Sequence, residues 1–324
     1  GWTLATSTFD YDGDGDQDLF LANDFGADVF YQNNGDGTFK DVSGITETAD
    51  RGSGMNVSVT DVNGDGFPDF YVANIDMFSK NIKIVFPNDL STINNYDSNL
   101  QKSFQYLSGN KLFLNPGDPQ GKKPFLADQG TRFEPGDRGW SWAAVFFDYE
   151  NDGDEDMYLS TGWVEGSFAA NQKKQMFLAE DGAYYLAPPA SAEAFASNGR
   201  SAVAVDIDRD GDLDLVLTNY LQPPAIFENT QAMPNHAVQL RLRGKAPNTG
   251  AVGARVMLSA NGKKQRREVS CGNGYLGQND EVIYVGIGAA ATAEAVVRWP
   301  SGKEQTVSDL KPGAVVEIVE GAAR

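Results

Sequence analysis

Four short stretches of the chain carry carboxylates at a regular spacing, and such carboxylates are the chemistry of a site for a hard metal ion. The stretches are DYDGDGDQD (10–18), DVNGDGFPD (61–69), DYENDGDED (148–156) and DIDRDGDLD (206–214). Together they hold 19 of the 37 acidic residues in residues 1–234. Because like charges repel at close range, this clustering favours a bound cation.

Each nine-residue window places oxygen donors at the same positions. Side chains at positions 1, 3, 5 and 9 and the backbone carbonyl at position 7 match the set of about six to eight oxygens that calcium prefers. Glycine always stands at position 6, where it permits a sharp turn. The sequence therefore predicts about four Ca²⁺ ions, one per loop. The predicted ligands are Asp10, Asp12, Asp14, Asp16 and Asp18; Asp61, Asn63, Asp65, Phe67 and Asp69; Asp148, Glu150, Asp152, Asp154 and Asp156; and Asp206, Asp208, Asp210, Asp212 and Asp214.

The spacing has two alternative interpretations. An EF-hand needs a glutamate at position 12 and helices on both sides, but position 12 is Leu21, Val72, Leu159 or Leu217. Acidic surface turns that bind nothing specific are the second alternative. Four copies of the same ligand pattern favour calcium over such turns.

The segments that flank the loops are typical of strands. TLATSTF, MNVSVT, SWAAVFF and SAVAV precede them, and LFLAN, FYVAN, MYLST and LVLTN follow. A second hairpin-like element follows each loop, as in VFYQNNGDGTFKDVS (29–43) with its Asp-Gly turn. Two hairpins per unit make a four-stranded antiparallel unit, which predicts an all-β fold of propeller blades.

The spacing of the loops predicts one insertion. Position 1 recurs after 51, 87 and 58 residues, and the long interval holds a single copy of the second hairpin. We therefore predict one blade with an insertion at about residues 75–110, acting either as a binding loop or as a lid. The chain opens directly on a blade strand, so further blades are expected to precede it or to come from another chain.

The windows and their flanks resemble the FG-GAP (VCBS-type) repeats of integrin-like β-propellers, from residue 1 to about 230. This resemblance implies calcium in the blade hairpins, held by the window residues. Asn63 is neutral, so the second loop is expected to bind more weakly, and the longer Glu150 is expected to shift the geometry of the third loop.

Charge and pattern change near residue 234. Residues 1–234 carry a formal charge of −23, and residues 235–324 carry +4. Six strand-like runs follow, with Asn261-Gly262 as a type I′ hairpin signal. We therefore predict two domains, 1–234 and 235–324, the second a small β-sandwich or barrel.

The second domain resembles the ASPIC/UnbV domain. The resemblance is carried by VGARV (252–256), REVSCGNGYLGQ (267–278), GIG (286–288) and VRWPSGKEQ (297–305). Together the two parts look like the cartilage acidic protein and UnbV-like family. That family is regarded as secreted or surface calcium-binding interaction modules.

Two further groups of residues have both a structural and a functional interpretation. The basic run Lys263, Lys264, Arg266 and Arg267 could face an acidic ligand or the acidic propeller itself, but alternation across a hairpin favours a solvated edge. Trp140 and Trp142 lie on one strand face, with Trp2 as the equivalent in the first blade. We predict that these tryptophans fill the core between blades, with a sugar-stacking platform as the alternative.

Composition excludes several function classes. A net charge of −19 argues against a nucleic-acid partner. Mean hydropathy is −0.39, and no apolar run approaches the length of a membrane span. Cys271 is the single cysteine, which excludes an intrachain disulfide and a cysteine-based zinc site, and the single histidine, His236, has no orienting neighbour in the sequence. No catalytic residue is therefore predicted.

The sequence thus predicts an exported, calcium-binding, non-enzymatic module that binds a protein or polysaccharide partner. The expected location is extracellular, on the cell surface or periplasmic; the opening residues lack a signal peptide, so any export signal is expected to have been removed. The alternatives are a polysaccharide lyase or hydrolase, and a lectin, on the same scaffold.

Overall fold

The computed structural model describes residues 2–75, 109–128, 139–163, 175–180, 182–187, 197–230, 234–272, 274–313 and 315–322. In these ranges the chain forms 22 strands and no helix, which confirms the predicted all-β class. The described ranges accordingly contain no helix that could span a membrane.

Four antiparallel sheets follow one another along the first part of the chain, each with its strands in chain order. The first contains β1 (Trp2–Phe9), β2 (Asp18–Asp24), β3 (Val29–Asn33) and β4 (Phe39–Asp41). The second contains β5 (Asn56–Thr60), β6 (Asp69–Ala73), β7 (Lys111–Leu114) and β8 (Leu126–Asp128). The third contains β9 (Ser141–Phe147), β10 (Asp156–Thr161), β11 (Gln175–Glu180) and β12 (Ala183–Leu186). The described strands of the fourth are β13 (Gly199–Val205), β14 (Asp214–Asn219) and β15 (Gln222–Phe227). The predicted pair of hairpins is confirmed in the first three sheets.

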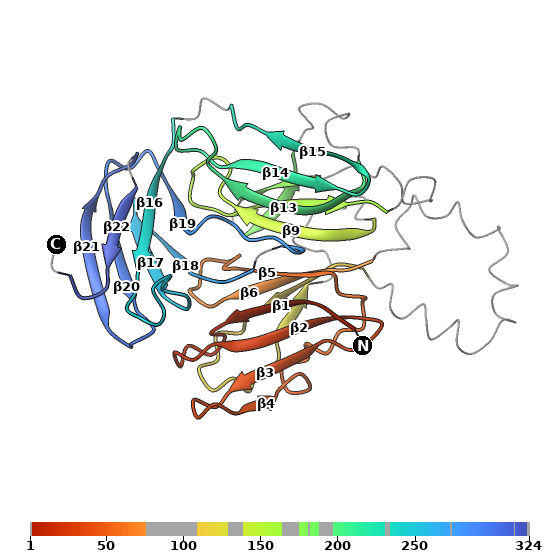
Figure 1. Cartoon of the computed structure of the whole chain (residues 1–324). Helices are drawn as coiled ribbons and strands as arrows, with labels where there is room; N and C mark the ends of the chain where they lie inside the picture. Colours follow the sequence, from red (N-terminus) through yellow and green to blue (C-terminus); the bar gives the residue numbers. More distant parts are fainter. Residues whose placement is uncertain are drawn as a thin grey trace, which may run out of the picture.

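The sheets are arranged as a fan (Figure 1), with β1–β4 and β13–β15 at its two ends. The strand that begins each sheet lies on the inner side, where β1 contacts β5, β5 contacts β9 and β9 contacts β13. Neighbouring sheets bury apolar side chains between them. Phe20, Phe30 and Phe70 lie between the first two sheets, Phe146 and Met157 between the second and third, and Tyr158 and Leu217 between the third and fourth.

The position of a strand in the fan determines how far it is buried. All seven residues of β9, in the middle of the fan, are buried, whereas the first half of β1, at one end, is mostly exposed.

The long interval between the second and third calcium-loop windows falls inside one sheet. β6 pairs directly with β7, with Phe70 opposite Phe113, although Ala73 and Lys111 are far apart in the sequence. The insertion therefore leaves and returns to the same sheet. Residues 76–108 lie outside the described residues, so their role as a binding loop or a lid stays a prediction.

The remaining strands form two sheets around a separate core. One sheet orders as β19 (Val282–Gly288), β16 (His236–Arg243) and β22 (Val316–Val319). The other orders as β18 (Lys263–Glu268), β17 (Arg255–Ala260), β20 (Ala293–Arg298) and β21 (Glu304–Leu310). Leu240, Leu258 and Trp299 are among the buried residues between them. Asn261 and Gly262 both have positive φ, 49° and 81°, as a type I′ turn between β17 and β18 requires.

A long connection joins β18 to β19 and enters the fan (Figure 1). We call residues 269–281 the inner connection; residue 273 lies outside the described residues. Asn279 Oδ1 accepts a hydrogen bond from the backbone N–H of Ala204 in β13, 3.2 Å away. The ring of Tyr275 meets the ring of Trp142 in β9 edge-on, with centroids 5.0 Å apart. The inner connection therefore reaches from the second domain to the far end of β9.

The predicted tryptophans divide into two groups. Trp140 and Trp142 share one face and stack with Trp163. Trp142 is buried with Met55 and Ile75, which flank β5 and β6 of the neighbouring sheet, as predicted for a core between blades. Trp2 is 73% exposed and contacts Phe25. The prediction that Trp2 fills a core between blades is wrong, because β1 lies at one end of the fan.

Candidate metal sites

Each predicted calcium loop connects the first two strands of its sheet. The four loops therefore emerge at the same end of the fan, between β1 and β2, β5 and β6, β9 and β10, and β13 and β14. The glycine at position 6 has a φ between 89° and 110° in every copy, namely Gly15, Gly66, Gly153 and Gly211. An L-residue rarely adopts this backbone conformation, which explains the repeated glycine.

The aspartate at position 1 closes the loop through its Oδ2 atom. In every copy, Oδ2 accepts a hydrogen bond from the backbone N–H of the position 6 glycine. The pairs are Gly15 to Asp10, Gly66 to Asp61 and Gly153 to Asp148, each 2.9 Å from nitrogen to oxygen, and Gly211 to Asp206, 3.2 Å. A local hydrogen bond of this kind holds the loop in a tight turn.

The aspartate at position 9 ties each loop to a third strand. One carboxylate oxygen accepts the N–H of position 2, and the other accepts an N–H at the end or the edge of the third strand of the sheet. For Asp18 these donors are Tyr11 and Asn33, for Asp69 Val62 and Asn115, for Asp156 Tyr149 and Ala179, and for Asp214 Ile207 and Asn229. Sequence reasoning assigned position 9 only as a ligand and missed this structural role.

The side chains at positions 3 and 5 fix the middle of the loop. Asn63, Asp12 and Asp208 accept the N–H two residues later, at position 5. The residues at position 5 do the same for position 7, as in Asp14 to Asp16, Asp65 to Phe67, Asp152 to Asp154 and Asp210 to Asp212. The loops therefore curl in one common way in all four sheets.

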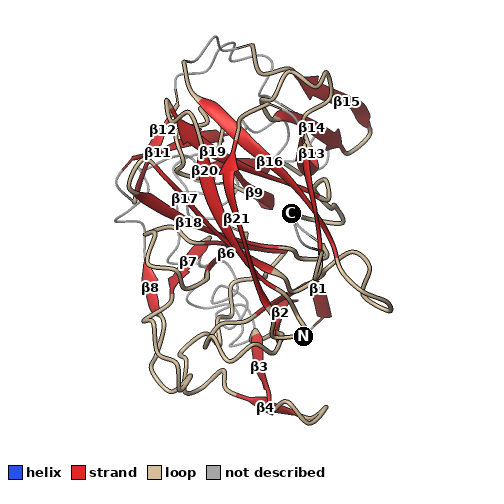
Figure 2. Ribbon diagram, turned by 90° about the vertical axis from the view of Figure 1, so that its left-hand side faces the viewer, coloured by secondary structure: helices blue, strands red, loops and turns tan. Residues whose placement is uncertain are grey.

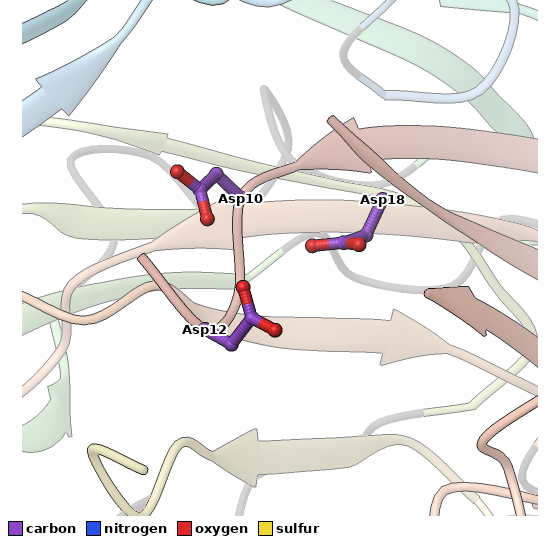
Figure 3. A group of neighbouring side chains, drawn as sticks. All are labelled: Asp10, Asp12 and Asp18. Carbon is purple, nitrogen blue, oxygen red and sulfur yellow. The ribbon is translucent and has the colours of Figure 1, made fainter. Parts of the chain in front are cut away.

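In two loops the carboxylates converge as a metal site requires. Asp10, Asp12 and Asp18 in the first loop each offer an oxygen within 4.8 Å of the others, and all three are at most 3% exposed (Figure 3). Asp206, Asp208 and Asp210 converge in the same way in the fourth loop. Among the described residues, the second and third loops form no such group of three. Calcium ligation stays a prediction for every loop, including the residues outside the two groups: Asp14, Asp16, Asp61, Asn63, Asp65, Phe67, Asp69, Asp148, Glu150, Asp152, Asp154, Asp156, Asp212 and Asp214.

Burial makes the ionised form of these carboxylates costly. It raises the pKa of Asp18 to about 8, of Asp61 to about 6, of Asp69 to about 7 and of Asp156 to about 9. The pKa of Asp10 and Asp12 is also raised, mainly by burial, and neighbouring carboxylates add to the shift. Buried carboxylates, which are all negative when ionised, fit a hard divalent cation such as Ca²⁺. The charge of the cation offsets the cost of ionising them.

The second domain covers the loop end of the fan. Figure 2, which looks onto this domain, shows its strands crossing in front of the sheets. Three position 1 carboxylates receive a donor from it at Oδ2. These donors are Arg255 Nη1 to Asp10 at 2.7 Å, the Gly286 N–H to Asp148 at 3.1 Å and the Tyr284 hydroxyl to Asp206 at 3.3 Å. The remaining position 1 aspartate is Asp61. The positive charge of Arg266 lowers the pKa of Asp61, but burial raises it by more.

The basic run corrects a prediction. Arg266 is buried, and its partner Glu268 accepts a hydrogen bond from Gln17 of the first loop at 2.6 Å. Arg267 pairs with Glu155 of the third loop at 3.3 Å, and Lys263 reaches Asp154 at 3.4 Å. Lys264 is exposed. The favoured solvated edge is therefore wrong for Arg266 and Arg267, which pack on the acidic loops of the fan, whereas Lys263 and Lys264 are exposed.

A close contact at Gly286 gives a direct test of this docking. A Cβ atom at Gly286 would lie 2.1 Å from Asp148 Oδ2 and 2.5 Å from the backbone carbon of Asn151. We expect Gly286→Ala to lower the free energy of unfolding by about 1–3 kcal/mol, the usual cost of overpacking. Gly250→Ala is the matched control, because a Cβ there meets nothing within 4 Å. Equal urea midpoints for the two variants would contradict the contact.

The two lone nucleophile or base candidates lie in exposed places. His236 is exposed at the start of β16, opposite Gly288. Cys271 is exposed in the inner connection. The prediction that neither residue is catalytic stays a prediction. Sequence reasoning missed the contacts of Arg255, Tyr284 and Gly286 with the loops. Arg255 and Gly286 belong to the stretches VGARV and GIG, but nothing in those stretches indicates which loop of another domain they meet.

Two protein families match separate stretches of this chain. The FG-GAP-like repeat family matches residues 10–72, and the ASPIC and UnbV family matches residues 244–324. "Cartilage acidic protein 1" of Xenopus tropicalis is 25% identical over 312 residues, which is 93% of this chain and 42% of the relative. The Homo sapiens protein of that name is 25% identical over 313 residues, with the same shares. The chain thus spans less than half the length of these relatives.

One solved structure is a more distant neighbour. The crystal structure of rhamnogalacturonan lyase YesW is 16% identical, covers 94% of this chain and 57% of the lyase chain, and gives a TM-score of 0.38. A likeness this weak has no bearing on activity. The family matches confirm the predicted resemblance: residues 10–72 are similar to an FG-GAP-like repeat, and residues 244–324 are similar to the ASPIC and UnbV domain.

Proposed function

We propose that this protein is an exported, calcium-stabilised, non-enzymatic binding module. The observation that carries the proposal is the group formed by Asp10, Asp12 and Asp18, three buried carboxylates that converge at the end of one sheet. Loops of the same length, glycine geometry and hydrogen bonding recur in the other three sheets. About four Ca²⁺ ions, one per loop, account for this repetition.

The window residues would bind calcium, and contacts from the second domain would fix the loops in position. Positions 1, 3, 5 and 9 supply carboxylate or amide oxygens, and position 7 supplies its carbonyl. The donors from Arg255, Tyr284 and Gly286 then fix the position 1 side chains from outside the loop. Calcium in this arrangement stabilises the contact between fan and domain, and no reaction step is assigned to it.

Non-enzymatic binding is proposed on the chemistry of the described residues. The carboxylates gathered at the loops are accounted for by metal and backbone partners. The only histidine and the only cysteine are exposed, and no hydrogen bond or ion pair within the described ranges joins either side chain to the base or orienting group that nucleophilic catalysis uses. A scaffold of repeated sheets offers broad surfaces for a protein or polysaccharide partner.

Apolar side chains at the two ends of the fan support assembly with further blades. Trp2 and Phe25 are exposed on the first sheet, and Leu221 and Ile226 are exposed on the fourth. These blades would come from the same longer protein or from another chain. Export to the cell exterior, cell surface or periplasm is proposed with the calcium sites, because weak loops of this kind suit compartments with millimolar calcium.

One assay tests the proposal against its enzymatic alternative. The protein is dialysed into calcium, its bound metal is counted by elemental analysis, and it is incubated with neutral and acidic polysaccharides. We expect about four Ca²⁺ ions per chain and unchanged polysaccharide length. Shortened polysaccharide would replace the proposal with a lyase or hydrolase, and a chain without bound calcium would remove its basis.

A further inference from the structure

A hollow of about 700 Å³ lies at the end of the third and fourth sheets opposite the candidate metal loops. Trp142 and Arg200 stand near the starts of β9 and β13, whereas the loops follow the ends of those strands. The walls include Trp142, Trp163, Arg200, Ser201, Tyr220 and Tyr275. Its size falls within the range of about 300–1,000 Å³ that is typical of small-ligand sites.

The guanidinium of Arg200 is held between aromatic rings. Its Cζ lies 4.1 Å from the ring centroid of Trp142 and 4.8 Å from that of Tyr220. Nη1 donates to the carbonyl oxygens of Gly199 at 2.8 Å and Gly162 at 3.3 Å. The rings and carbonyls fix the plane of the guanidinium, so its position does not depend on a ligand.

This cation has no acidic partner among the described residues. No ion pair joins Arg200 to a described carboxylate, and no aspartate or glutamate of the described ranges lines the hollow, although the chain has 45 acidic residues. Burial lowers the pKa of Arg200 from its usual value. A partly buried guanidinium gains most from a carboxylate, which its planar donors can bind in bidentate fashion.

The rest of the hollow favours a flat, partly apolar ligand. Trp163 and Trp142 are nearly parallel, with centroids 5.3 Å apart, and Tyr275 meets Trp142 edge-on. Leu276, which also lines the hollow, is 85% exposed. The Ser201 hydroxyl adds a hydrogen-bonding group to the wall, whereas the Thr218 hydroxyl is taken up by the backbone N–H and carbonyl of Ser201. Tyr220, which is 40% exposed, and Leu276 offer apolar surface to the C–H face of a sugar ring, and the Ser201 hydroxyl suits its edge.

We propose that this hollow binds a uronic acid residue of an acidic polysaccharide, with the sugar carboxylate on Arg200 and the ring against the neighbouring aromatic side chains. This inference rests on the proposed binding function, because it names the class of partner. A neutral sugar would leave Arg200 without a counter-charge. The carboxylates of the metal loops lie at the other end of the strands, beyond about one Debye length of roughly 8 Å at physiological salt, so their repulsion is largely screened.

The test compares ligands that differ only in charge. The calcium-loaded full chain is titrated with trigalacturonic acid and with its carboxyl-reduced trisaccharide, and binding is followed by calorimetry and tryptophan fluorescence. We expect the acid to bind about ten- to a hundred-fold more tightly, as one charge-assisted contact allows. Triglutamate is the peptide arm. Equal binding of acid and reduced sugar, equal binding of triglutamate, or no binding of trigalacturonic acid would overturn the proposal.

Two variants assign the effect to Arg200. Arg200→Met keeps a long side chain over Trp142 and should remove the preference for the acid, with little change for the reduced sugar. Arg243→Met is the matched control, because Arg243 lies on the second domain and pairs with Glu281 and Glu317. A preference that survives in Arg200→Met, or disappears in Arg243→Met, would contradict the assignment.

The same samples separate this inference from the proposed function. Bound calcium and the length of the trisaccharide are measured in parallel. Four bound calcium ions with no binding of trigalacturonic acid would overturn the uronate site alone. Binding with shortening of the sugar, or binding without bound calcium, would overturn the proposed function and leave the pocket in place.

Discussion

Removal of calcium is expected to lower the melting temperature of this protein by about 10 °C or more. A ligand present at about a hundred times its Kd contributes about 2.7 kcal/mol per site, and about 1 kcal/mol shifts the Tm of a chain of this general size by about 2–4 °C. The physical reason lies in the first loop, where Asp10, Asp12 and Asp18 are buried together. Without a cation, these groups must repel one another or take up protons.

Thermal unfolding followed by circular dichroism, in millimolar calcium and in chelator, measures this effect. Magnesium should substitute poorly, because it keeps its own waters and demands octahedral geometry. Asp12→Ala should reduce the bound calcium by one ion, whereas Glu304→Ala, an exposed position on β21, should leave the count unchanged. Identical melting temperatures in calcium and in chelator would contradict the prediction.

Loss of the Arg255 side chain is expected to destabilise the calcium-free protein strongly. Arg255 Nη1 lies 2.7 Å from Asp10 Oδ2, and the side chain of Asp10 is 1% exposed. Removal of one partner from a buried pair leaves an uncompensated charge and costs about 3–5 kcal/mol. Arg255→Met should therefore lower the urea midpoint in chelator, and by much less in calcium, because the metal supplies a second counter-charge to Asp10.

Arg243→Met serves as the control for that experiment. Its side chain is 42% exposed and faces exposed Glu281 and Glu317, so its loss should cost less than about 1 kcal/mol. If the urea midpoint falls no further for Arg255→Met than for Arg243→Met, the buried pair of Arg255 and Asp10 contributes little to stability. If the urea midpoint of Arg255→Met falls equally in calcium and in chelator, the contribution of Arg255 does not depend on the metal site.

The parts of the fold that sequence reasoning found are those encoded locally. Asp10, Gly15 and Asp18 lie within nine residues, and the loop that they form depends on hydrogen bonds inside that stretch and at the end of the neighbouring strand. The insertion was found because Phe70 and Phe113 belong to matching halves of one repeated unit. Because the loop and hairpin recur along the sequence, each copy can be compared with the others, which is not possible for a single loop.

The parts that sequence reasoning missed depend on how distant segments pack. A hairpin with alternating basic residues has the same pattern whether its outer face meets water or another domain, so Arg266 and Arg267 were placed in solvent. Trp2 was assigned to a core by analogy with Trp142, but the analogy fails where the fan has no neighbouring sheet. Arg200 has no local motif, since its aromatic partners come from three separate segments.

The inner connection has a consequence for the order in which this protein folds. Asn279 satisfies the backbone N–H of Ala204, which lies 75 residues earlier in the chain, and Tyr275 packs on Trp142, which lies earlier still. During synthesis, the sheets of the fan emerge before the segment that fills their inner side. The inner side of the fan therefore stays uncovered, with the Ala204 N–H on β13 lacking this acceptor, until the second domain has been made. A chain cut between the two domains would keep that nascent, aggregation-prone state, so the carboxyl-terminal third acts as the last step of folding for the whole molecule.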